Sequence, residues 1–238
     1  MTVPVAVLDM DGTLVPGFLA GTLLRELRTL PGADHRAVNS ALGVLRRYRD
    51  REISHETCAR AFYPAYARAL RDLPAPLLGE LGARAWERHR ATLFPYARPL
   101  VGLLRAHGLV TCLLSGSPAE AIAPAAADLG VDRFWGASAE LCAGVATGRL
   151  LSGPALPGGK GAVLDGLDRH TPVDWAASFA IGDSASDVET LGRVALPVAF
   201  EPDPALRRVA ADRGWPVADR DTVLDLAAVL LRGGRSSR

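Results

Sequence analysis

Two acidic residues stand two positions apart near the start of the chain, in the segment LDMDGT at 8–13. They are Asp9 and Asp11, at the end of the short apolar segment VPVAVLD at 3–9 and just beyond it. Two carboxylates this close repel each other, so burying them requires a cation or a proton. A divalent cation with oxygen ligands meets that requirement, and Mg²⁺ suits a site shared with a phosphate group. The spacing predicts a metal-binding, catalytic pair; the alternative is an ordinary Asp-Gly turn.

A second acidic pair, Asp183 and Asp187, lies in GDSASD at 182–187, again directly after an apolar segment. Four carboxylates placed after two strands are enough oxygen ligands for a hard cation. The same letters also fit a capped helix start, because Ser186 and Glu189 have the spacing of a capping box. The two interpretations are compatible, and the sequence leaves both open.

The segment SGSP at 115–118 combines a hydroxyl with a helix start. The Ser115 hydroxyl and the N–H of Gly116 can form an anion site at a helix N-terminus. The structural alternative is a plain cap, with Ser117 as N-cap, Pro118 in the first turn and Glu120 closing a capping box. Taken alone, this segment favours the plain cap.

The chain has a single lysine, Lys160, against 26 arginines. Glycines flank it in GGKG at 158–161. A compact ammonium on an open backbone suits a phosphate oxygen or a carboxylate, and arginine does not replace it there. The alternative is a solvated loop lysine, which the strong preference for arginine elsewhere makes a poorer explanation.

Apolar segments of strand length alternate with helical patterns, which predicts an α/β fold with a Rossmann-like parallel sheet. The expected strands lie at 3–9, 109–115, 178–183 and 194–200, with two shorter ones within 134–150. Active sites of such sheets lie at the carboxyl ends of the strands. Asp9, Ser115 and Asp183 each end an expected strand, so we expect them to meet at one edge.

Amphipathic helical segments fill the region from about 18 to 94 and interrupt the α/β pattern after the first strand. We expect this region to be an inserted helical cap over the carboxyl edge. The predicted organisation is a core domain of residues 1–15 and 96–238 and a cap of residues 16–95.

Together these segments resemble the haloacid dehalogenase (HAD) superfamily of phosphohydrolases. LDMDGT resembles its first motif, LLSGSP its second, Lys160 its third and GDSASD its fourth, in the family's order. The insertion between the first two motifs is similar to the helical cap of subclass IB, which contains phosphoserine phosphatase. The resemblance covers residues 1–15 and about 96–205.

The resemblance implies a phosphatase whose nucleophile is Asp9, forming an aspartyl-phosphate, with Asp11 as acid and base. It implies Mg²⁺ as cofactor, held by the Asp9 carboxylate, the Asp11 backbone carbonyl and Asp183, with Asp187 in support. It also implies that Ser115, the Gly116 N–H and Lys160 hold the phosphoryl oxygens.

The resemblance also bears on the substrate, expected to be a small phosphomonoester. Phosphoserine phosphatases place an acidic residue where this chain has Phe18, and a cap arginine near the position of Phe62. Both partners for phosphoserine are absent or moved, which favours another leaving group. We expect Phe18, His55, Phe62 and Tyr66 as substrate contacts; the alternative is that these aromatic residues form the core of the cap.

Other functions stay open at this level. A phosphotransferase would pass the phosphoryl group to an alcohol, and a phosphoserine phosphatase with an altered cap would keep the familiar substrate. A non-enzymatic binding protein has no evident need for Asp9 and Asp11, and a phosphomutase is a further alternative.

Composition sets the remaining limits. The chain has 238 residues, with 27 basic and 26 acidic residues and a net charge of +1. This balance gives no reason to expect nucleic acid as a partner, and no apolar run has the length of a membrane span. Three scattered cysteines do not make a disulfide framework. We expect a cytoplasmic monomer or homodimer with a disordered tail, GGRSSR.

Overall fold

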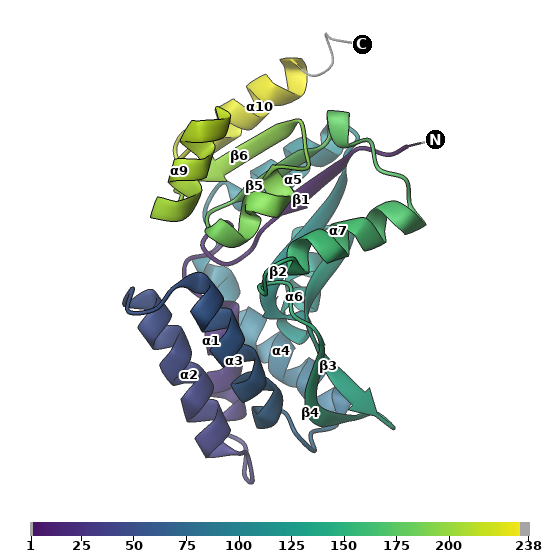
Figure 1. Cartoon of the computed structure of the whole chain (residues 1–238). Helices are drawn as coiled ribbons and strands as arrows, with labels where there is room; N and C mark the ends of the chain where they lie inside the picture. The colour runs from purple at the N-terminus through teal and green to yellow at the C-terminus, as the bar shows by residue number, and fades with distance from the viewer. Residues whose placement is uncertain (1, 234–238) are drawn as a thin grey trace.

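The computed structural model describes residues 2–233 (Figure 1). The expected disorder of the tail falls, from Gly234 onward, outside these described residues. No helix within 2–233 combines the length and the apolar character needed to cross a membrane.

A single seven-stranded sheet forms the centre of the molecule, with the strand order β4-β3-β2-β1-β5-β6-β7. Every neighbouring pair is parallel except β3 and β4, which form an antiparallel hairpin at one edge. The strands are β1 (Val5–Leu8), β2 (Val110–Pro118), β3 (Arg133–Cys142), β4 (Val145–Ser152), β5 (Phe179–Gly182), β6 (Leu196–Phe200) and β7 (Val217–Ala218). The expected α/β sheet is confirmed, and the two-residue β7 was not predicted.

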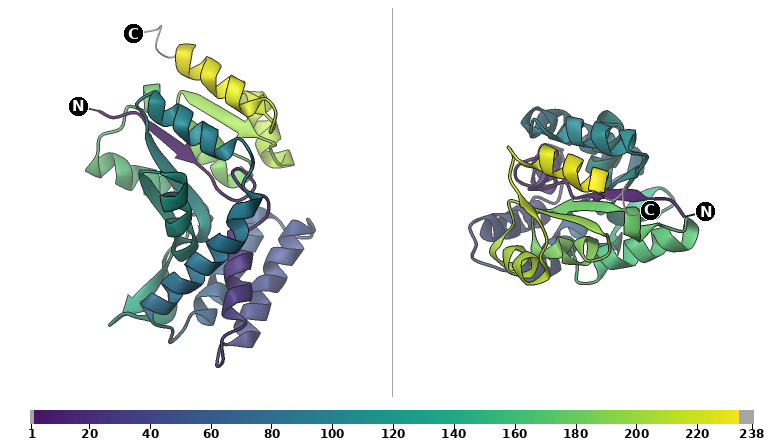
Figure 2. Two further views of the ribbon diagram at one scale, coloured as in Figure 1. Left: turned by 180° about the vertical axis from the view of Figure 1, so that it is seen from behind. Right: turned by 90° about the horizontal axis from the view of Figure 1, so that it is seen from above.

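Ten α-helices surround the sheet in the described part of the chain. They are α1 (Leu19–Leu27), α2 (His35–Arg49), α3 (His55–Ala69), α4 (Ala75–His89), α5 (Ala97–Ala106), α6 (Ala119–Leu129), α7 (Gly159–His170), α8 (Val188–Leu191), α9 (Pro204–Arg213) and α10 (Val223–Gly233). Helices α5 and α10 lie behind the sheet in the view of Figure 1, and α7 and α9 lie in front (Figures 1 and 2).

The central strand β1 shows why both faces are covered. Ala6 and Leu8 belong to an apolar cluster that includes α5, α6 and α10, whereas Val5 and Val7 belong to a second cluster with α7, α8 and α9. Side chains alternate along a strand, so an unbroken apolar segment buries both of its faces. Polar side chains are therefore possible only beyond Leu8, and Asp9 is the first of them.

Helices α1 to α4 lie together at the lower end of the molecule in Figure 1. Helix α2 packs on α3, α1 packs on α4, and α4 packs on α6 of the core. A glycine allows this last contact, because a Cβ on Gly82 would lie 1.9 Å from the carbonyl oxygen of Glu120. The helical content of this insertion matches the expectation, while its action as a separate cap of residues 16–95 stays a prediction.

Both capping boxes expected from the sequence are wrong. The N-cap of α6 is Pro118 without a side-chain hydrogen bond, because β2 continues through Ser117. The box expected from Ser186 and Glu189 is formed instead by Ser184 and Asp187, which cap a short 3₁₀ turn before α8. In each case the polar side chains have partners in the site described below.

Candidate active site

The residues expected at the carboxyl edge of the sheet meet there. Asp9 follows β1, Ser115 lies near the end of β2, and Asp183 follows β5, the strand paired with β1. Lys160 enters from the first turn of α7, two residues after Gly158, which has φ +76°. That left-handed conformation favours glycine. Gly158 therefore allows the chain to turn into α7, whose first turn carries Lys160.

Lys160 is fully enclosed and contacts two carboxylates. Its Nζ lies 2.7 Å from Asp9 Oδ1 and 2.6 Å from Asp187 Oδ1, and its side chain is 2% exposed. Burial alone lowers a lysine pKa, but the charges and hydrogen bonds of Asp187 and Asp9 outweigh it, so the pKa of Lys160 is raised. Lys160 is a buried cation that balances charge behind Asp9, and it is not among the residues that line the cavity.

One lysine does not neutralise the acidic cluster. Carboxylate oxygens of Asp9, Asp183 and Asp187 lie within 4.8 Å of one another. Burial, partly opposed by Lys160, raises the pKa of Asp9 to about 7. Burial and then the charges of Asp9 and Asp187 raise the pKa of Asp183 well above its ordinary value. Three oxygen donors with uncompensated charge are what a hard divalent cation requires, so these residues fit a metal site.

A glycine keeps this cluster open. Gly12 has φ +88°, and a Cβ there would lie 2.1 Å from Asp183 Oδ2. A side chain at this position would push the Asp183 carboxylate out of the cluster. The Gly of LDMDGT therefore permits both the turn after β1 and the approach of Asp183.

Both oxygens of Asp187 already have protein donors. Oδ1 accepts from Lys160, and Oδ2 accepts from the backbone N–H groups of Asp183 and Ser184 and from the Ser184 hydroxyl, at 3.2, 3.0 and 3.1 Å. This arrangement fixes Asp187 as a support for Asp183 and Lys160. The predicted role of Asp187 in supporting a bound cation stays a prediction.

Asp11 is held by a different set of donors. Its Oδ1 accepts from the backbone N–H of Leu19 at 2.8 Å. Its Oδ2 accepts from the Ser117 hydroxyl and lies 3.5 Å from the Ser115 hydroxyl. Burial raises the pKa of Asp11, and the hydrogen bonds from Ser117 and Leu19 partly oppose that shift. A carboxyl group whose pKa is raised is suited to donate a proton.

Ser117 is a site residue that the sequence analysis missed. It was interpreted as a helix cap, whereas its hydroxyl donates to Asp11 and accepts from the N–H of Ala20 at 3.1 Å. A signal was available, because residues two apart in a strand face the same side. Ser115 and Ser117 both lie within β2, so the second hydroxyl follows the first onto the site.

The predicted phosphate-binding residues lie at the same edge. Ser115 is fully buried, and its Oγ accepts from the Ser117 N–H at 3.0 Å. The Gly116 carbonyl accepts from the Tyr63 hydroxyl at 3.0 Å, and a Cβ on Gly116 would lie 2.7 Å from the Ala155 Cβ. Ser115 and Gly116 both line the cavity beside Asp9 and Asp11.

A cavity of about 1070 Å³ opens above this edge, between the core and the helical insertion. Its floor contains Asp9, Asp11, Ser115 and Asp183. Its opposite wall includes Phe18, His55 and Phe62, three of the four residues predicted to contact substrate. The volume slightly exceeds the range of about 300–1,000 Å³ typical of sites for drug-sized ligands.

Tyr66, the fourth predicted contact, does not line the cavity. Its side chain is fully buried, stacks on Phe62 at 5.6 Å between ring centroids, and donates to Glu120 of α6 at 3.4 Å. Tyr66 lies one helical turn beyond Phe62 on the same side of α3, and its contact with Glu120 of α6 places it in the core while Phe62 borders the cavity. The prediction for Tyr66 is therefore wrong. Tyr48 and Tyr63 line the cavity instead.

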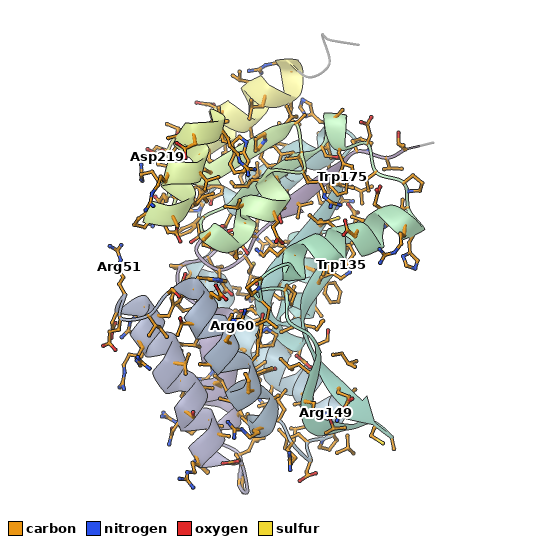
Figure 3. The ribbon with its side chains drawn as sticks, in the orientation of Figure 1. Arg51, Arg60, Trp135, Arg149, Trp175 and Asp219 are labelled. Atoms are coloured by element: carbon orange, nitrogen blue, oxygen red, sulfur yellow. The ribbon has the colours of Figure 1, made fainter. Side chains whose placement is uncertain are left out.

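Arg60, the arginine closest in sequence to Phe62, does not line the cavity above Asp9, whereas Arg49, Arg51 and Arg208 line its exposed part. Arg60 of α3 pairs with Glu56 at 2.8 Å, and its side chain is 63% exposed. It lines a separate cavity of about 700 Å³ between α3 and β4 rather than the one above Asp9. Figure 3 labels it on α3. Arg60 therefore does not take the place of a substrate-binding arginine in this conformation.

Comparison with known proteins agrees with this geometry. The family model of haloacid dehalogenase-like hydrolases matches residues 6–192. The phosphoserine phosphatase SerB2 of Mycobacterium tuberculosis is 31% identical over 160 residues, which cover 67% of this chain and 37% of that protein. The inhibition of morphological differentiation protein of Streptomyces azureus is 31% identical over 157 residues, covering 64% of this chain and 50% of that protein.

Solved structures share the fold. A protein with unknown function from Bordetella pertussis Tohama I has a TM-score of 0.74 and 25% identity, over 92% of this chain and 100% of that chain. A phospho-aspartyl intermediate analogue of phosphoserine phosphatase has a TM-score of 0.65 at 19% identity, over 92% and 94%.

The match to the family model includes all four motifs at the carboxyl edge of the sheet, from Asp9 to Asp187. The chain spans only 35% to 39% of the length of the mycobacterial relatives. The comparison therefore identifies the family and supports a phosphatase, while substrate and mechanism need their own argument. This chain belongs to the haloacid dehalogenase-like hydrolases.

Proposed function

We propose that this chain is a Mg²⁺-dependent phosphatase that hydrolyses a small phosphomonoester through an aspartyl-phosphate. The observation that carries the proposal is the placement of Asp9. One carboxylate oxygen is bound to Lys160, and the residue lines the cavity beside Asp11, whose carboxyl group has a raised pKa. A buried nucleophile next to a proton donor, in one cavity, suits a two-step hydrolysis.

In the first step, the Asp9 carboxylate attacks phosphorus, and the bond from phosphorus to the leaving oxygen breaks. Asp11 donates its proton to that oxygen, and the alcohol departs. In the second step, the ionised Asp11 takes a proton from water, which attacks phosphorus; the bond from phosphorus to the Asp9 oxygen breaks, releasing phosphate and restoring the Asp9 carboxylate. The donors from Ser117 and Leu19 keep Asp11 in one orientation in both steps.

The metal-binding residues would be the carboxylates of Asp9 and Asp183 and the backbone carbonyl of Asp11, with Asp187 in support. Bound there, Mg²⁺ would offset the charge of the carboxylates and of the phosphoryl oxygens. Ser115 and the Gly116 N–H would hold phosphoryl oxygens, and Lys160 would balance the charge on Asp9. Electrostatic positioning of this kind supplies most of the catalysis in phosphoryl transfer.

The substrate we propose is not phosphoserine, although several relatives are named phosphoserine phosphatases. Phe18 and Phe62 line the cavity where the resemblance places an acidic and a basic partner for that substrate. Without a charged partner at these two positions, a buried ammonium or carboxylate is disfavoured, and the arginines that line the cavity, Arg49, Arg51 and Arg208, are exposed. Residues 16–95 would act as the cap that closes over the bound ester.

The test is phosphate release from a panel of phosphomonoesters in the presence of Mg²⁺, with Asp9→Asn as the matched control. The panel contains L-phosphoserine, sugar phosphates, alkyl phosphates and aryl phosphates. We expect Mg²⁺-dependent release that the Asp9→Asn variant lacks, with phosphoserine a poor substrate. If phosphoserine is preferred, the substrate proposal fails; if Asp9→Asn keeps full activity, the mechanism fails.

Product analysis with added glycerol separates hydrolysis from phosphoryl transfer, because only transfer would give a new phosphoester.

A further inference from the structure

Three rings from three different segments form a continuous wall of the cavity. Phe18 precedes α1, Tyr48 lies in the last turn of α2, and His55 begins α3. The ring centroids of Phe18 and Tyr48 are 5.6 Å apart, and those of Tyr48 and His55 are 5.7 Å apart. All three line the cavity that contains Asp9. Helices α1, α2 and α3 lie side by side in Figure 1, which brings these distant positions together.

The polar atoms of this aromatic wall are free for a ligand. Within residues 2–233, no hydrogen bond uses the Tyr48 hydroxyl or the ring nitrogens of His55. Both side chains are half-buried at the cavity surface. Both groups reach the cavity surface without a hydrogen-bond partner in the described part of the protein, so each is available to a hydrogen-bonding atom of a ligand.

The wall is also electrically neutral. Burial lowers the pKa of His55, although the charges of Asp187 and Asp203 oppose the shift, so the imidazole is uncharged near neutral pH. Of the charged residues at the exposed rim on this side, Arg49 pairs with Asp50 and Glu56 pairs with Arg60. Arg51 and Arg208 also line the cavity, but both are exposed at its rim, and Figure 3 labels Arg51 at the outer edge of the molecule. A ring with an uncharged polar group therefore matches the wall better than an ionic group.

We propose that Phe18, Tyr48 and His55 form the leaving-group subsite, and that the substrate is a phosphomonoester of an uncharged, ring-bearing alcohol or phenol with a hydrogen-bonding substituent. This inference rests on the proposed phosphatase function and names the substrate class for the same site. The ring stacks against the aromatic wall, and its substituent bonds to the Tyr48 hydroxyl or to His55. Aromatic pairs prefer offset-stacked or edge-to-face arrangements, which stabilise them beyond the burial of their surface.

The first experiment compares kcat/KM for phenyl phosphate and ethyl phosphate in the wild type and in Tyr48→Leu. The ratio of the two values cancels the different reactivities of the esters when variants are compared. We expect the ratio to fall about tenfold in Tyr48→Leu, mainly through a higher KM for the aryl ester. The matched control is His35→Leu on the exposed start of α2, outside the cavity, whose ratio stays at the wild-type value. An unchanged ratio in Tyr48→Leu overturns the proposal.

The proposed hydrogen bond from the substituent of the substrate ring is tested with Tyr48→Phe, which keeps the ring and removes the hydroxyl. With 3-hydroxyphenyl and 4-hydroxyphenyl phosphate as substrates, we expect the preference of the wild type for a hydroxylated ester over phenyl phosphate to drop at least fivefold in Tyr48→Phe or in His55→Leu. If neither variant changes this preference, the assigned hydrogen bonds are wrong.

A binding measurement separates this proposal from the proposed function. Phenylphosphonate and ethylphosphonate are not hydrolysed, so calorimetric titration of the wild type measures the Kd of each ligand without catalysis. We expect phenylphosphonate to bind at least tenfold more tightly, and Tyr48→Leu to remove that difference. Tighter aryl binding without phosphate release from any ester would reject the phosphatase and keep the subsite. Equal binding of both phosphonates, with normal phosphate release, would reject the subsite alone.

Discussion

The orientation of the Asp11 carboxyl group depends on the Ser117 hydroxyl, which lies outside the motif LDMDGT. The donors at its two oxygens are the Leu19 N–H and the Ser117 hydroxyl, and Ser117 is itself fixed by the Ala20 N–H. Both backbone donors belong to the first turn of α1, so the start of the helical insertion and the end of β2 together orient the proposed acid. An acid held in this way keeps its proton aimed at one point in the cavity.

We therefore expect Ser117→Ala to lower kcat by about tenfold to a hundredfold, since a hydrogen bond to a charged group contributes about 1.5–3 kcal/mol. KM should change little, because Ser117 bonds to Asp11 rather than to the substrate. Steady-state kinetics on the best ester of the panel measure both values. Ser117→Thr should restore much of kcat.

Ser138→Ala is the matched control for that prediction. Its hydroxyl bonds to the Gly136 carbonyl at 3.4 Å in β3, away from Asp11. The control should keep wild-type kinetics. If Ser117→Ala raises KM and leaves kcat intact, Ser117 contacts substrate and the positioning role is wrong.

The carboxylate of Asp132, the residue directly before β3, connects β3 to the neighbouring strand β2. Asp132 Oδ2 accepts from the Thr111 N–H at 2.9 Å and from the Thr111 hydroxyl at 2.7 Å. Burial raises the pKa of Asp132, but these hydrogen bonds and the charges of Arg105 and Arg133 outweigh it, so the pKa is lowered from its ordinary value of 3.8. The contact fixes the register of the strand that carries Ser115 and Ser117.

We expect Asp132→Asn to lower the free energy of unfolding at neutral pH by about 1 kcal/mol, a small value because the side chain is partly exposed. A carboxyl group with a lowered folded-state pKa stabilises the fold above its unfolded pKa and loses that effect as the pH falls through the folded value. The difference between wild type and variant should therefore be constant above about pH 5 and shrink below pH 3.8. Urea unfolding between pH 3 and 7 measures it, with Asp212→Asn on the exposed face of α9 as control. A difference that grows toward low pH contradicts the assignment.

Elements and motif residues were predictable where one local pattern decides them. Apolar strand segments end in Asp9, Ser115 and Asp183, and parallel strands bring their carboxyl ends to one edge. The caps were not predictable, because Ser117 fits both a helix N-cap and the last residues of a strand, and the length of β2 decides between them. Likewise Phe62 and Tyr66 lie on similar faces of α3, and only the packing of Tyr66 against α6 places its side chain in the core.

At the scale of the whole molecule, one tyrosine connects the insertion to the floor of the site. Tyr63 of α3 donates to the Gly116 carbonyl and accepts from the Ala155 N–H, each at 3.0 Å. Burial raises the pKa of Tyr63 to about 12, so the hydroxyl stays protonated and keeps both bonds at neutral pH. Such a contact between α3 and the end of β2 was outside the reach of sequence patterns, since it depends on how the insertion packs on the sheet.

The acidic cluster also draws on distant parts of the chain, because Asp9 follows β1 while Asp183 and Asp187 follow β5. Unfolding of the sheet separates them, so a cation bound by the native cluster stabilises the whole fold by mass action. We expect Mg²⁺ at a hundred times its Kd to raise the free energy of unfolding by about 2.7 kcal/mol. Asp183→Asn should lose this gain, and Asp165→Asn, a surface acid paired with Arg193, should keep it. Urea unfolding with Mg²⁺ and with EDTA measures the effect. An equal gain in Asp183→Asn would place the cation elsewhere in the molecule.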